Sequence, residues 1–357
     1  MRALYFLAAT SVALTHLWAV EKFDTDPNHQ LPKPDGKAAD LSKPVKVFIM
    51  MGQSNMFGMG DVSPLDKKGT LEYLTKTEKR YPHLLDHAGG WTTRNDVRYV
   101  QVMPTRSGGM ETKHDEWLTV KGKLIGPEIQ FGHIMGQLLD APVILVKSCI
   151  GNRSLGWDLL PPGSERYTVD GKTYAGYKDS PGFWIEGQPK KEVNWYAGKQ
   201  YDDDMANVKK VLGEIGKHYP GAQQYEIAGF VWWQGHKDQN PVYASRYEIN
   251  LVNLIKALRK DYHAPGAPIV LATGCGNPQR ESFGLQIAEG QLAMNDAKKH
   301  PEFVGNVKCV DVRDFWPAVE DSPNPKQGYH YFHNAGTYME VGNALGWAMA
   351  DLLKASK

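Results

Sequence analysis

One short segment of this sequence could carry a catalytic serine. It reads GQSNM at residues 52–56 and follows directly after an apolar run at 45–51. A serine in a tight turn between a strand and a helix can be exposed at the edge of a sheet, with neighbouring backbone N–H groups facing a developing oxyanion. Ser54 is therefore a candidate nucleophile, although a serine that only caps a helix N-terminus would give the same pattern.

Two further turns carry groups that suit acyl transfer. Residues 147–155 read KSCIGNRSL after an apolar run, and residues 232–238 read WWQGHKD after another. Gly151 could bring a backbone N–H close to a ligand, Asn152 could donate a side-chain hydrogen bond, and Gln234 is a neutral donor suited to an oxyanion hole. Asp238 is an acid that could orient a catalytic histidine.

A fourth segment, GYHYFHN at residues 328–334, supplies two histidines just before the last predicted helix. A histidine in such a loop could take the proton of a serine. A single histidine among aromatic residues is more often a packed core residue. Two histidines, together with the other three turns, favour a catalytic function for this loop.

The elements around these turns predict one α/β architecture. Short apolar runs predict buried strands at 45–51, 143–147, 227–233, 269–273 and 307–312, and helical patterns lie at 127–139, 202–218, 243–262, 283–299 and 337–354. Strands that alternate with helices predict a doubly wound parallel sheet, whose active groups collect beyond the carboxyl ends of its strands. Two stretches poor in periodicity, about 58–125 and 156–200, are predicted to be long loop insertions.

The ends and the composition suggest the compartment. Residues 1–19 have the charged start and apolar run of a secretory signal, residues 20–44 read as a linker or surface arm, and residues 45–357 as a single domain. We therefore expect a secreted or periplasmic protein without a membrane span. A net charge of +1 gives no electrostatic case for nucleic acid. The three cysteines show neither metal-ligand spacing nor a disulfide framework, and whether any of them pair stays open.

Together, the four turns resemble those of SGNH-type hydrolases, and within them the sialate O-acetylesterase and acetylxylan esterase-like group. That group has a G-Q-S-N turn after its first strand, a G-G-x-S-[LI] turn, a Q-G-x-x-D turn and a late histidine loop. The resemblance covers residues 45–354. It implies a flavodoxin-like SGNH fold without metal or cofactor, Ser54 as nucleophile and His330 as base, with His333 as second choice. It also implies an oxyanion hole made by Ser54, Gly151 and Gln234.

The chain departs from the group at three positions. Asn152 follows Gly151 where the group usually has a second glycine, and His236 stands where many relatives have glutamate. Gln327 occupies the position three residues before the histidine, where relatives often have aspartate. The third member of a triad is thus open between Asp238, Asp321 and none.

The expected function is a secreted serine esterase that removes O-acetyl groups from a carbohydrate through an acyl-serine. The residues expected to contact substrate are Gln53, Asn152, Trp233, His236 and His333, and Trp184 and Trp195 could stack on sugar rings. Two alternatives remain: a non-catalytic carbohydrate-binding protein on the same fold, and a short-chain lipase or thioesterase. The sugar, its linkage and the oligomeric state are not predicted.

Overall fold

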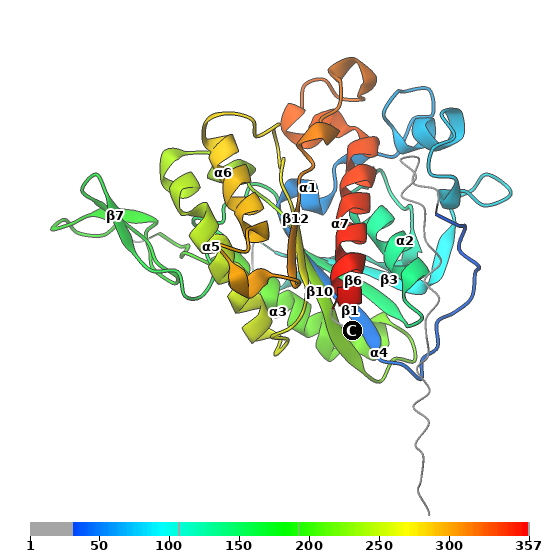
Figure 1. Ribbon diagram of the computed structural model, residues 1–357, viewed down its shortest axis with the longest axis horizontal. Coiled ribbons are helices and arrows are strands. Elements are labelled where there is room, and N and C mark those ends of the chain that lie inside the picture. Colours follow the sequence, from blue (N-terminus) through cyan, green and yellow to red (C-terminus); the bar gives the residue numbers. More distant parts are fainter. Residues whose placement is uncertain (1–30, 106–107, 192, 356–357) are drawn as a thin grey trace, which may run out of the picture.

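A seven-stranded sheet forms the centre of the protein (Figure 1). The structure, a computed structural model, describes residues 31–105, 108–191 and 193–355. Strands follow the order β12-β11-β10-β1-β6-β3-β4, and all neighbours are parallel except β3 and β4. Their bounds are β1 Val45–Gly52, β3 Thr93–Pro104, β4 Met110–Thr119, β6 Val143–Ser148, β10 Tyr225–Trp233, β11 Ile269–Ala272 and β12 Val307–Val310. All five predicted strands are present.

Helices cover both faces of this sheet. Phe48 and Met50 of β1 join the apolar cluster on one face, and Val47 and Ile49 join the cluster on the other, because successive side chains of a strand alternate. The first cluster includes α2 (Glu128–Leu138) and α7 (Ala335–Ala355), and the second includes α3 (Lys199–Gly213) and α5 (Pro241–Asp261). The predicted doubly wound α/β architecture is confirmed.

Two predicted helices are shorter than expected. The helix predicted at 202–218 starts earlier, as α3, and breaks before a separate turn, α4 (Ile215–His218). The helix predicted at 283–299 ends as α6 (Ser282–Leu292) and a 3-10 turn, Ala293–Asn295. Asn295 at its end exchanges two hydrogen bonds of 2.8 Å with the backbone of Cys309 in β12. This tertiary contact holds Asn295 against β12 at the edge of the sheet. A helix that continued past Asn295 would carry the chain away from this edge.

The first predicted loop insertion was wrong for residues 93–104 and 110–119. These residues form β3 and β4, which extend the main sheet beyond β6. Buried polar side chains interrupt the apolar pattern of β3: Arg98 pairs with Asp115 of β4 at 2.5 Å, and Gln101 accepts from the Tyr99 hydroxyl at 2.6 Å. Elsewhere in this insertion β2 (Gly60–Asp61) pairs with β5 (Leu124–Ile125).

The second insertion carries a small sheet of its own. Its strands β7 (Tyr167–Val169), β8 (Lys172–Tyr174) and β9 (Phe183–Ile185) project from the body of the protein, on the left of Figure 1. The predicted signal and residues 20–30 of the predicted arm lie outside the described residues. The rest of the arm, residues 31–44, has no helix or strand but packs Leu31 into the core.

All three cysteines are buried free thiols. Among the helices of the described part of the chain, none combines the length and the apolar character needed to cross a bilayer.

Candidate active site

The three turns predicted from the sequence meet at one edge of the sheet. β1 lies between β6 and β10, so the chain runs to one side of β1 before it crosses to the other. In doubly wound sheets, ligands bind at such a switch point, beyond the carboxyl ends of the strands. The turns that follow β1, β6 and β10 are the ones that carry Ser54, Gly151 and Gln234.

Ser54 opens the short helix α1 (Ser54–Phe57) and is partly exposed. The turn before it requires glycine, because a Cβ on Gly52 would lie 2.2 Å from the carbonyl oxygen of Trp233. Gly151 lies directly against the serine, since a Cβ built on it would be 3.4 Å from Ser54 Cβ. Asn152 next to it is exposed, with a left-handed φ of 59°. The structure thus brings Ser54, Gly151 and Asn152 together.

Asn55, the residue after Ser54, fastens the histidine turn to the serine turn. Its side chain is fully buried, and its Nδ2 donates to the carbonyl of Tyr329 at 3.1 Å. The Tyr338 hydroxyl of α7 donates to Asn55 Oδ1 at 2.7 Å and lies 3.2 Å from the carbonyl of His330. The carbonyl groups of Tyr329 and His330 are therefore both connected, through Asn55, to the turn that carries Ser54. We call these contacts the Asn55 clamp.

The histidine turn, residues 328–333, is strained. Tyr331, Phe332 and His333 have φ values of 51°, 53° and 62°, which is unfavourable for residues other than glycine. Packing maintains this conformation: the buried ring of Tyr331 stacks on Trp233 at 5.5 Å, and its hydroxyl donates to the carbonyl of Gly274. Strain of this kind, held by its surroundings, is typical of functional sites.

Within this turn, His330 offers a free ring nitrogen. Its Nδ1 lies 2.9 Å from Gln327 Oε1, whereas Nε2 has no hydrogen-bond partner among the described residues. Burial, followed by the positive charge that His333 and His236 can carry, lowers the pKa of His330 to about 4. The imidazole is then neutral at pH 7, as a general base must be.

His333 has no such free nitrogen. Its Nδ1 lies 3.0 Å from Asp61 Oδ1, and its Nε2 lies 3.0 Å from Gln327 Oε1. Because both nitrogens are engaged within the protein, the contacts favour His330 as the base and leave His333 unsuited to contact substrate.

Asp238, which was predicted to complete a triad, has its hydrogen-bond partners elsewhere in the structure. Its carboxylate is fully buried and accepts from the backbone N–H groups of Leu155 at 2.9 Å and Gly156 at 2.7 Å. It also accepts from Gln234 Nε2 at 2.6 Å, and no contact joins it to either histidine of the late turn. Burial raises the pKa of Asp238 to about 6, against the opposing effect of these hydrogen bonds. Asp238 ties the turn after β6 to the turn after β10.

Gln234 cannot serve as the predicted oxyanion donor. Its Nε2 carries two hydrogens, and these go to Asp238 and to the carbonyl of Arg153 at 2.8 Å. Its side chain has no exposed surface. Both amide hydrogens of Gln234 are thus used within the protein, and neither is left for a ligand.

Three other predicted residues also have structural functions. Gln53 is buried and accepts from the backbone N–H of Gly235 at 3.3 Å, and Trp233 is buried with its indole N–H donating to the carbonyl of Thr273 at 3.1 Å. Neither can contact substrate. Asp321, the second choice for the acid, forms an exposed ion pair with Lys68 at 2.7 Å. It makes no contact with His330.

Two rings lie in a row beside His330. The Tyr329 ring packs against the His330 ring with centroids 4.5 Å apart, and the half-buried His236 ring lies parallel to the Tyr329 ring, 6.3 Å from it. Tyr329 is 47% exposed, the highest exposure of any residue of this cluster. Trp195 carries the guanidinium of Arg153 over its ring at 5.2 Å, so it lies beside the turn after β6. Trp184 belongs to β9, in the projecting small sheet.

Asp61 and the Asn55 clamp were not predicted from the sequence. Asn55 is part of the GQSNM motif, so its position was visible but its contacts were not. Asp61 precedes His333 by 272 residues and follows no recognisable motif, so nothing in the sequence connects the two.

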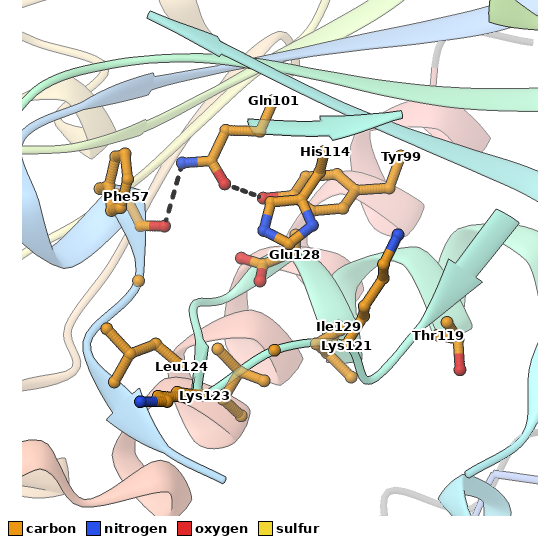
Figure 2. Close-up of a pocket in the computed structure, with 13 residues that line it drawn as sticks. Phe57, Tyr99, Gln101, His114, Thr119, Lys121, Lys123, Leu124, Glu128 and Ile129 are labelled. Carbon is orange, nitrogen blue, oxygen red and sulfur yellow. Dashed lines mark hydrogen bonds between the residues drawn. The ribbon is translucent and has the colours of Figure 1, made fainter. Parts of the chain in front are cut away.

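A pocket behind α1 is separate from these groups (Figure 2). In it, Gln101 joins the Tyr99 hydroxyl at 2.6 Å to the carbonyl of Phe57 at 3.4 Å. Glu128 in its wall forms a buried ion pair with Lys147 at 2.5 Å. None of the residues predicted to be catalytic or to bind substrate lines this pocket.

Several solved structures are similar to this chain. A protein from Arabidopsis thaliana has 18% identity and a TM-score of 0.49, with 86% of this chain and 98% of that chain covered. A carbohydrate acetylesterase from Xanthomonas citri has 13% identity and a TM-score of 0.47, with 85% and 55% covered. The protein NanS has 12% identity and a TM-score of 0.46, with 90% and 98% covered. Among curated proteins, no sequence matches this chain significantly.

A family profile described as carbohydrate esterase, sialic acid-specific acetylesterase, matches residues 184–350. The matched region contains the turn after β10 and the histidine turn, whereas Ser54 and Gly151 lie before it. Over residues 184–350 the chain thus matches the sialic acid-specific acetylesterases, which confirms the predicted resemblance and the predicted enzyme class, a carbohydrate acetylesterase.

Proposed function

We propose that this protein is a secreted serine esterase that removes O-acetyl groups from a carbohydrate through an acyl-serine intermediate. The Asn55 clamp is the observation that carries the proposal. It connects the backbone of the histidine turn, in which His330 has a ring nitrogen without a hydrogen-bond partner among the described residues, to the turn of the partly exposed Ser54 at the switch point of the sheet. A nucleophile and a base in fixed positions are the minimum that acyl transfer by serine requires.

In the proposed reaction, His330 Nε2 removes the proton of Ser54 Oγ as that oxygen attacks the acetyl carbonyl. The backbone N–H groups of Ser54 and Gly151 stabilise the resulting oxyanion, and one such donor typically contributes about 3 kcal/mol. The amide of Asn152 is the third donor, in place of Gln234. His330 then protonates the sugar oxygen as the C–O bond to the acetyl group breaks.

The acetyl-serine is then hydrolysed by the same groups. His330 Nε2 removes a proton from a water molecule, whose oxygen attacks the acetyl carbonyl of Ser54. Breakdown of the second tetrahedral intermediate releases acetate, and the proton held by His330 returns to Ser54 Oγ. One water is consumed for each acetate and each sugar hydroxyl that form.

Tyr329 is the proposed stacking surface for the sugar. Its ring is exposed beside His330, whereas Trp233, one of the three tryptophans predicted to contact the sugar, is buried. An apolar ring face next to the base would hold a pyranose while its acetyl group reaches Ser54. His236, which lies parallel to Tyr329, would line the same side of the site.

Acetate release from a panel of acetylated glycans tests the proposal. Ser54→Ala should fold with an unchanged melting temperature and lose at least about a thousandfold in activity. Ser245→Ala, an exposed serine on α5, is the matched control and should retain full activity. Wild-type activity in Ser54→Ala would refute the mechanism.

The same panel separates the alternatives. A non-catalytic binding protein, which the missing aspartate at Gln327 would favour, would bind acetylated glycans without releasing acetate. A lipase or thioesterase would prefer longer acyl chains or thioesters over acetylated sugars. Export is tested by the mass of the protein recovered outside the cytoplasm, which should lack about the first 19 residues.

A further inference from the structure

Four side chains form a continuous line that ends on His330. Asp61 Oδ1 lies 3.0 Å from His333 Nδ1, and His333 Nε2 lies 3.0 Å from Gln327 Oε1. The same Gln327 oxygen lies 2.9 Å from His330 Nδ1. The line therefore connects a carboxylate to the base through one histidine and one neutral amide.

The chemistry of each group fixes the hydrogens along this line. An amide oxygen only accepts hydrogen bonds, so both nitrogens that face Gln327 Oε1 carry hydrogen. His330 with hydrogen on Nδ1 keeps a lone pair on Nε2, which is the form that can take a proton from Ser54. An ionised Asp61 also only accepts, so His333 carries hydrogen on Nδ1 as well as Nε2. In this arrangement His333 donates from both ring nitrogens, Nδ1 to Asp61 and Nε2 to Gln327.

The Gln327 amide is the one group in this line that could rotate, which would present its NH2 group to the two histidines in place of its oxygen. Its nitrogen would then donate to both rings, and His330 would have to accept at Nδ1 and carry its hydrogen on Nε2. In that form His330 cannot act as a base. A His333 that donates from both nitrogens prevents the rotation, since neither nitrogen can then accept from the amide NH2.

We propose that Asp61 is a positioning residue for the reaction. By accepting a hydrogen bond from His333 Nδ1, it directs His333 Nε2–H to the Gln327 oxygen and so holds His330 in the tautomer whose Nε2 is free. Through the side chains of His333 and Gln327, Asp61 thus gives His330 the orientation that an aspartate at position 327 would give it directly. This inference rests on the proposed function, because it assumes that His330 is the base for Ser54.

The surroundings of the line agree with this assignment. Asp61 and His333 are partly shielded, with side chains 26% and 11% exposed, so their attraction is screened less than that of a surface pair. The other titratable groups that face the line are His236, Tyr329 and Tyr338. The positive charge of His333 also contributes, after burial, to the lowered pKa of His330.

Asp61→Asn removes the charge at nearly constant shape and is the central test, with Asp321→Asn on the exposed Lys68 pair as matched control. The amide of Gln327 is then free to rotate, so kcat should fall about tenfold to a hundredfold. This is less than the roughly 10⁴-fold loss of a base held directly in the wrong tautomer. KM and the melting temperature should change little, and Asp321→Asn should match wild type.

Rescue distinguishes positioning from a structural function. Gln327→Glu places an acceptor-only carboxylate against His330 Nδ1, so Asp61→Asn with Gln327→Glu should recover most of the lost kcat. The acid limb of its pH profile should also move upward, because a carboxylate beside His330 favours the imidazolium. Histidine side-chain ¹⁵N spectra should show hydrogen on Nδ1 of His330 in wild type and a mixed population in Asp61→Asn.

Two results would overturn the inference: an unchanged kcat in Asp61→Asn, or a loss that Gln327→Glu does not rescue in a folded double variant. Ser54→Ala in the same assay keeps the two proposals apart. An active Ser54→Ala would refute the proposed function itself. An inactive Ser54→Ala together with a normal Asp61→Asn would refute only the positioning by Asp61.

Discussion

The turn after β10 and the histidine turn both carry polar residues that the sequence predicts to be catalytic, but the hydrogen bonding of these residues differs. In the turn after β10, Gln234 and Asp238 are fully buried, and their hydrogen bonds are completed within the protein. In the histidine turn, the line from Asp61 ends on His330 with one nitrogen free. A carboxylate or amide at the end of a strand is thus not sufficient for catalysis. It needs an atom left free to face the substrate.

Removal of the base should give the largest difference between the two turns. His330→Ala leaves Ser54 without a proton acceptor, so kcat/KM for an acetyl ester should fall at least about a thousandfold. The ring is half-buried and, among the described residues, makes one side-chain hydrogen bond, to Gln327, so circular dichroism and the melting temperature should stay near wild type. Activity within tenfold of wild type would show that another group is the base.

Loss of the clamp should have the next largest effect. Asn55→Ala frees the carbonyl of Tyr329 and the hydroxyl of Tyr338, so the histidine turn can shift. A displacement of about 1 Å can cost about a hundredfold in rate, and we expect a fall in kcat of that order. Tyr338→Phe removes only the hydroxyl and should lose less. Equal kcat in Asn55→Ala and wild type would show that the clamp does not position the base.

The pH profile compares the two turns without mutation. His330 is active when neutral, so kcat/KM should stay level down to about pH 5 and fall about tenfold per pH unit below its pKa of about 4. If Asp238 were part of the machinery, activity would require its ionised form and would fall instead below its pKa of about 6. Activity assays stopped at fixed times, together with circular dichroism at each pH, distinguish this fall in kcat/KM from acid unfolding.

Asp238→Asn should change stability more than catalysis. Asparagine keeps one acceptor oxygen, so at least one of the buried N–H groups that Asp238 satisfies loses its partner, which typically costs about 1–3 kcal/mol. We expect a lower midpoint in urea unfolding and a kcat within about threefold of wild type, a barrier change below about 0.7 kcal/mol. Asp321→Asn should change neither. A thousandfold fall in kcat for Asp238→Asn would restore it as the catalytic acid.

The strands and the positions of the turns could be predicted because they depend on local pattern. An apolar run such as 45–51 is recognisable from its own residues, and a parallel sheet then places the turns at one edge. β3 was missed because Arg98 and Gln101 find partners within the sheet, which a single strand's sequence does not show.

Which polar residue does chemistry could not be predicted in the same way. Asp238 receives its hydrogen bonds from backbone groups 82 and 83 residues away, and Asp61 reaches His333 across 272 residues. These contacts exist only in the folded chain. Only the structure shows that His330 has a ring nitrogen without a hydrogen-bond partner in the described part of the chain and that both amide hydrogens of Gln234 are used. Both residues nevertheless lie in recognisable sequence motifs.

Labelling with a fluorophosphonate, followed by intact-mass measurement and peptide mapping, tests the central claim most directly. Wild type should gain one adduct, located on Ser54, because only an activated serine reacts with such a reagent at a useful rate. His330→Ala should not be labelled, whereas Asp238→Asn should be labelled wherever it is folded. An adduct on another residue, or labelling that depends on Asp238 and not on His330, would contradict the assignment of Ser54 and His330 as the catalytic pair.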